Sequence, residues 1–139
     1  MTDTGIALYI KEVTRHIDEY MQELDELSQI DQLNNRDYRA AERLLQLMTE
    51  VCIGLSKHWL KKFKNTTSSN AYQTFSELTQ LGVLTDNELL SWRKIIGLRN
   101  VFVHDYLNID QEIVKTIIKK QHYVTMHLFS QKALAELAS

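Results

Sequence analysis

Residues 38–60 read YRAAERLLQLMTEVCIGLSKHWL, and apolar side chains recur in them at alternating spacings of three and four. The recurring residues are Tyr38, Ala41, Leu45, Met48, Cys52, Leu55 and Trp59. This spacing draws one apolar stripe along an α-helix. Leu44, Leu47 and Val51 add a second stripe, offset by one position, so the apolar arc is wider than one neighbouring helix needs. The pattern therefore predicts a helix in the middle of a bundle.

The same periodicity occurs on both sides of this stretch. An apolar stripe from Ile6 to Leu27 precedes it, separated by the polar turn at 29–35. Residues 64–71, KNTTSSNA, are polar and small, which is typical of a connecting loop. Helices are therefore expected before, along and after the central stripe.

Local signals mark the ends of the later helices. Gly82 stands where a C-terminal cap is expected for a short helix, and Thr85 with Glu88 has the T-x-x-E spacing of a capping box. Asp110 is a plausible N-cap for a last helix that runs through Leu128. These signals divide the second half of the chain into three expected helices.

The composition agrees with an all-α fold. There is no proline and there are only four glycines in 139 residues, a length typical of one domain spanning 1–139. A long three-four repeat also fits a coiled coil, but the wide arc and short turns favour an antiparallel helix bundle. We predict an antiparallel bundle of four to five helices.

Several functional classes lack their sequence features. No apolar run is long enough to cross a membrane, no secretion signal opens the chain, and the single cysteine, Cys52, suits a reducing compartment. We therefore expect a cytoplasmic protein. No phosphate-binding glycine loop, nucleophile elbow or spacing of metal ligands is present, so neither a cofactor nor a metal is expected.

The net charge of −2 does not draw the chain onto nucleic acid over long range. RNA contact would need a local patch, and three basic clusters are available. They are Lys57, Lys61, Lys62 and Lys64; Arg93, Lys94 and Arg99; and Lys115, Lys119 and Lys120. Taken alone, each cluster is more typical of a solvated helix face.

Residues 95–106, IIGLRNVFVHDY, concentrate polar chemistry at the end of an apolar run. On one ideal helix over 86–104, Arg99 and His104 lie roughly 140° apart and do not share a face. They meet only if the helix turns back near His104, or if a second copy of the chain faces the first. Apolar residues on two sides of this helix favour the second arrangement, so we expect a symmetric homodimer.

These residue types suit the cleavage of RNA without a metal. The arginine fork matches a phosphate, and a histidine accepts the proton of a ribose 2′-hydroxyl and returns one to the leaving oxygen. Asn100 would hold the substrate or orient His104. A histidine at a helix end is also common for electrostatic reasons alone, so spacing by itself leaves a purely structural role open.

The string RNVFVHDY, residues 99–106, resembles the R-N-x-x-x-H-x-Y signature of the HepT-type toxins in the HEPN ribonuclease superfamily. The resemblance extends to residues 38–60, 75–100 and 107–118, in the family's order. It implies an all-helical homodimeric ribonuclease toxin with Arg99 and His104 as the catalytic pair and Asn100 as the neighbouring polar residue. It also implies RNA as substrate, tRNA being the family-level expectation.

The resemblance further implies a partner. In this family the antitoxin is a minimal nucleotidyltransferase (MNT), which adds AMP to the motif tyrosine, here Tyr106. Whether the antitoxin modifies the toxin or only covers it stays open. One alternative is a non-catalytic binding partner of a nucleotidyltransferase, and another is an interaction protein whose motif serves only packing.

Overall fold

The computed structural model describes residues 4–64, 70–104 and 110–139, and these are all-α, as the sequence predicts. Six helices run through them, namely α1 (Thr4–Ser28), α2 (Asn35–Lys61), α3 (Ala71–Gln80), α4 (Asp86–His104), α5 (Gln111–Lys119) and α6 (Val124–Ala138). The fold class is confirmed, with one helix more than the four to five expected. In this part of the chain no helix is both long and apolar enough to span a bilayer.

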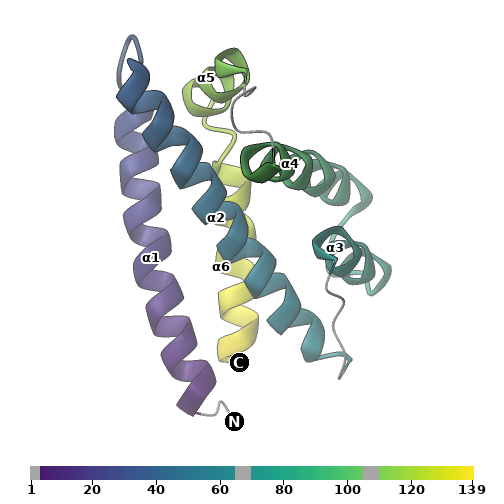
Figure 1. The fold of residues 1–139 in the computed structure, drawn as a ribbon. Helices are drawn as coiled ribbons and strands as arrows, with labels where there is room; N and C mark the ends of the chain where they lie inside the picture. The colour runs from purple at the N-terminus through teal and green to yellow at the C-terminus, as the bar shows by residue number, and fades with distance from the viewer. Residues whose placement is uncertain (1–3, 65–69, 105–109) are drawn as a thin grey trace.

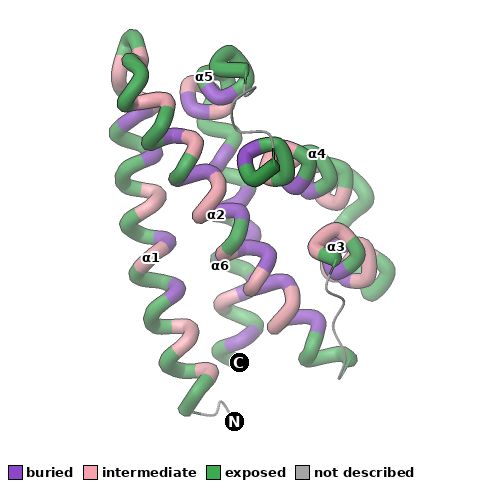
Figure 2. Tube along the Cα trace, viewed as in Figure 1, coloured by how far each residue is buried: buried purple, intermediate pink, exposed green. Residues whose placement is uncertain are grey.

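The central position expected for the second helix is confirmed. Helix α2 packs against all five other helices, and Figure 2 shows buried segments recurring along it, whereas α1 is exposed along most of its length. Both predicted stripes contribute, because Ala41, Leu45, Met48, Cys52 and Leu55 are buried and Leu44 is buried beside them.

Helices α1, α2 and α6 each pack against the other two, and α3 and α4 pack against α2 and against each other (Figure 1). Helix α1 runs antiparallel to α2, as expected for helices joined by a short turn. Helix α6 runs in the same direction as α2, because α3, α4 and α5 return the chain to the end where α2 begins.

Helix α3 ends where the sequence predicts. Gly82 has φ +81°, its backbone N–H donates to Thr79 O, and the N–H of Val83 donates to Leu78 O. This pair of bonds is a Schellman motif, which needs a left-handed residue just past the helix. Glycine adopts that conformation without steric cost.

The expected last helix is in fact two helices, which corrects the sequence prediction. Helix α5 closes with the same hydrogen-bond pattern, from Gln121 N to Ile118 O and from His122 N to Ile117 O. Gln121 takes the left-handed conformation, with φ 54°, although it is not a glycine. Its side chain donates to Ser28 Oγ at 3.3 Å, which ties the turn to the end of α1. The helix therefore breaks for a tertiary reason.

An aromatic cluster fixes α4 against the rest of the bundle. Trp92 of α4 stacks on Phe75 of α3, with ring centroids 4.3 Å apart, and meets Phe129 of α6 edge-on at 5.0 Å. Trp59 of α2 completes the cluster against Phe129 at 5.8 Å. Four helices thus share one set of rings, and the position of α4 follows from their packing.

Candidate functional site

Helix α4 carries the candidate residues that the structure describes. Its start is the predicted capping box: Glu88 N donates to Thr85 Oγ1 at 3.1 Å, and Thr85 N donates to Glu88 Oε1 at 3.0 Å. Trp92, Ile96 and Phe102 are its buried residues. These anchors set which side of α4 faces α2, and therefore where Arg99 points.

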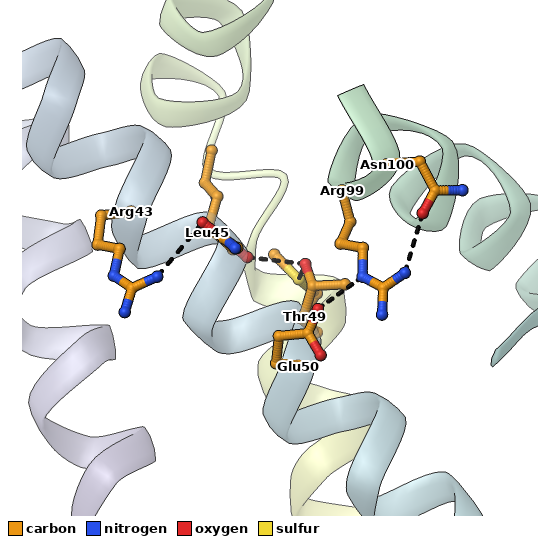
Figure 3. Close-up of polar contacts among 8 residues, drawn as sticks. Arg43, Leu45, Thr49, Glu50, Arg99 and Asn100 are labelled. Atoms are coloured by element: carbon orange, nitrogen blue, oxygen red, sulfur yellow. Dashed lines mark hydrogen bonds and ion pairs between the residues drawn. The ribbon is translucent and has the colours of Figure 1, made fainter. Parts of the chain in front are cut away.

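Arg99 reaches across to α2 and pairs with Glu50 (Figure 3). Its Nε donates to Glu50 Oε1 at 2.6 Å, and its Nη1 donates to Asn100 Oδ1 at 2.9 Å. The two side chains of the ion pair are 26% and 43% exposed, so the pair lies at the surface. Two of the residues expected at the site, Arg99 and Asn100, are therefore in direct contact.

This arrangement leaves part of the guanidinium available to a ligand. A guanidinium has five N–H donors, and only those on Nε and Nη1 have a partner among the described residues. Glu50 fixes the plane of the group from its Nε side. The outer edge, which includes Nη2, can donate to two oxygens of a phosphate in the bidentate geometry that arginine favours.

His104 is the last residue of α4 and is exposed. Because α4 is continuous through residue 104, His104 lies roughly 140° around the helix from Arg99. Helix α4 ends at His104, and the residues that follow lie outside the described part of the chain, so both arrangements considered for the pair remain untested. Tyr106, the residue expected to be modified, lies outside the described residues.

A cavity of about 560 Å³ opens beside Arg99, between α4 and helices α2, α5 and α6. Its walls are mainly apolar and include Leu45, Leu98, Phe102 and Met126. Val101, which also lines it, is 39% exposed, and Val103 at the end of α4 is 43% exposed. The side of α4 next to the candidate site is thus apolar and incompletely covered.

Among the described residues, the other reactive side chains do not form a competing site. Cys52 is fully buried, and burial raises the pKa of its thiol well above the usual range, so it is an inert core residue as expected. His58 packs against Tyr9, with centroids 4.4 Å apart; burial lowers its pKa, and Lys61 lowers it further. Within the three described segments, no three potential ligands gather in a metal-binding group.

Glu50 is the site residue that sequence reasoning missed. It lies 49 positions before Arg99, and its helix carries other acidic residues that make no such contact. The one signal in the sequence is that Glu50 is the single charged residue between Arg43 and Lys57. This feature does not identify Arg99 as the partner, so the ion pair could be found only from the packing of α2 against α4.

The sequence profile of a family described as "Ribonuclease HepT-like" matches residues 10–133. A protein of Aphanizomenon flos-aquae named tRNA nuclease HepT is 34% identical over 94 residues, which cover 63% of this chain and 64% of that protein. A protein of Shewanella oneidensis named mRNA nuclease HepT is 29% identical over 80 residues, covering 58% of this chain and 59% of the relative. The matched stretches thus span under two thirds of either relative.

Solved structures share the fold. One, described as a toxin-antitoxin with AMP-PNP, has a TM-score of 0.73 at 23% identity and covers 95% of this chain and 99% of its own. Another, a tri-AMPylated Shewanella oneidensis HEPN toxin in complex with an MNT antitoxin, has a TM-score of 0.71 at 24% identity, covering 94% and 96%. At these identities the likeness establishes the arrangement of helices.

Proposed function

The chain belongs to the HepT-like ribonuclease family, and from this we propose that it is a cytoplasmic ribonuclease toxin that cleaves RNA without a metal. The observation that carries the proposal is the state of Arg99. Glu50 and Asn100 hold its guanidinium at the surface, its outer donors have no partner among the described residues, and His104 ends the same helix five residues later. The guanidinium is thus oriented so that it can bind a phosphate, and a histidine lies on the same helix.

In the proposed reaction, His104 accepts the proton of a ribose 2′-hydroxyl. The oxygen then attacks the adjacent phosphorus, the bond to the 5′-oxygen breaks, and that oxygen leaves with a proton returned by a histidine. The products are a 2′,3′-cyclic phosphate and a 5′-hydroxyl. Arg99 stabilises the negative charge that develops on the phosphoryl oxygens, and Asn100 holds the guanidinium and the substrate.

A second copy completes the site in this proposal. The 140° between Arg99 and His104 on one helix keeps their side chains from converging on one phosphate within a single chain. A two-fold axis beside α4 would bring the two motifs together and would cover Val101 and Val103, which are exposed in the single chain. The proposed active unit is therefore a homodimer.

The direct test is cleavage of RNA by the purified chain in the presence of EDTA. We expect fragments that end in 2′,3′-cyclic phosphate, produced at the same rate with and without the chelator, because no step uses a metal. Two substrates, a tRNA pool and an unstructured mRNA fragment, identify the preferred class, with tRNA expected to be cut faster. If neither is cut in any buffer, the chain is not a ribonuclease and the non-catalytic alternative replaces this proposal.

The proposed antitoxin is an MNT nucleotidyltransferase that attaches AMP to Tyr106. Each AMP would add bulk and a phosphodiester charge two residues after His104, which would exclude substrate phosphate. Co-expression with such an enzyme should raise the intact mass by one or more AMP groups and abolish cleavage, whereas the Tyr106→Phe protein should stay active. Inhibition with no change in mass would mean that the antitoxin acts by covering the site.

A further inference from the structure

The face of α2 opposite its buried side carries cations toward both ends; four of them are exposed and Lys57 is half-buried. We call this set of cations the α2 basic stripe; it consists of Arg36, Arg39, Arg43, Lys57 and Lys61. At 100° per residue, these five positions fall within an arc of roughly 60°. From first to last the stripe measures about 37 Å, at 1.5 Å per residue.

Among the described residues, none of these five cations is held in an ion pair by a neighbouring carboxylate. Within the same segments, the one side-chain hydrogen bond from the stripe runs from Arg43 Nη1 to Gln46 Oε1 at 3.4 Å, and its acceptor is neutral. Glu50 is the one acidic residue on the same arc, and Arg99 already engages it. Glu42 borders the stripe half-buried; burial raises the pKa of its carboxyl and the nearby charge of Arg39 lowers it, so Arg39 is partly offset without an ion pair. A chain of net charge −2 thus concentrates unpaired positive charge on one helix face.

The stripe passes the candidate site at its midpoint. Arg43 precedes Glu50 by seven residues and Lys57 follows it by seven, so cations lie about 10 Å to either side of the point where Arg99 attaches. Figure 3 shows Arg43 and Glu50 on α2 with Arg99 of α4 reaching the latter. We infer that the α2 basic stripe is the track that holds an RNA strand across Arg99, an inference that rests on the proposed ribonuclease function.

The geometry favours an extended polyanion over a folded acidic partner. A strand whose reacting phosphate lies at Arg99 continues in both directions, and the stripe offers donors in both directions. Three of the five cations are arginines, whose forks match phosphate oxygens. The basic clusters recognisable in the sequence include Lys57 and Lys61 but none of the three arginines, because the clusters follow proximity along the chain, whereas the stripe follows the helix face.

The test is binding of a fluorescent single-stranded RNA to the His104→Ala protein, measured by anisotropy over a range of salt concentrations. For Arg39→Gln/Arg43→Gln we expect roughly a 25-fold loss of affinity at about 0.1 M salt, and a salt slope shallower by about 1.4, since each phosphate contact to a single strand contributes about 0.7. Arg39→Lys/Arg43→Lys should keep most of the affinity, because the charge remains.

The matched control is Lys11→Gln/Lys132→Gln, which removes the same charge from exposed positions on α1 and α6. It should change RNA affinity less than threefold. Equal losses of RNA affinity in both double variants would mean that net charge alone matters. An unchanged RNA affinity with weaker antitoxin binding would mean that the stripe is a protein interface. Either result would contradict the inference that the stripe holds RNA. Binding is read without cleavage, so the stripe and the nuclease proposal fail separately.

Discussion

Replacing Trp92 with alanine is expected to lower the free energy of unfolding by about 3–5 kcal/mol. Trp92 is 1% exposed and contacts rings from two other helices, so its removal leaves a cavity that Phe75 and Phe129 cannot both close. Urea unfolding followed by circular dichroism measures the change. A loss of this size is a large share of the stability of an ordinary domain.

Leu8→Ala is the control for this experiment. Leu8 is apolar but 59% exposed on α1, so its truncation should change stability by less than about 0.5 kcal/mol. Trp92→Phe should fall between the two, because it keeps an aromatic ring against Phe75. If Trp92→Ala were as mild as Leu8→Ala, the aromatic cluster would not be what fixes α4 against the bundle.

The parts of the fold that could be predicted from the sequence are those with local causes. The capping residues Thr85 and Glu88, the N-cap Asp110 and the left-handed Gly82 each act within four residues of their own position. Asp110 Oδ1, for example, accepts from Glu112 N at 2.9 Å. Periodicity likewise needs only the chain itself, so the central helix and its buried side were predictable.

The break between α5 and α6 was not predictable for the opposite reason. Gln121 is an unusual residue for a left-handed position, and the contacts beside it come from α1, through Ser28 and Asp25. Tyr123, fully buried just past the break, donates to Asp25 Oδ1 at 2.7 Å. These partners are more than ninety positions away along the chain, so no local sequence pattern could predict the contacts.

The candidate site likewise has a part that could be predicted from the sequence and a part that could not. The residues Arg99, Asn100 and His104 stand out by their types and spacing within one helix, and the contact between the first two follows from their adjacency. The ion pair with Glu50 and the α2 basic stripe depend on how two helices pack and which face they leave to solvent. Sequence reasoning could therefore name the candidate reacting groups but not the residues that orient them.

We expect His104→Ala to reduce RNA cleavage by about 10²–10⁴-fold, because the imidazole is the one group in the proposed mechanism that moves protons. RNA binding and the unfolding free energy should change little, since His104 is exposed at the end of α4. The rate of appearance of cyclic-phosphate fragments measures the effect. His127→Ala, on α6 and outside the candidate site, is the matched control and should cleave at the parental rate.

Mixed dimers extend this prediction to the composite site. Arg99→Ala and His104→Ala homodimers should both be inactive, but a heterodimer purified through two different tags keeps one intact guanidinium and one intact imidazole, on different copies. If the two motifs face each other across a two-fold axis, these groups belong to one site and the heterodimer should cleave RNA faster than either homodimer. A heterodimer as inactive as both parents would mean that each copy uses its own pair, which the 140° separation on a continuous α4 argues against.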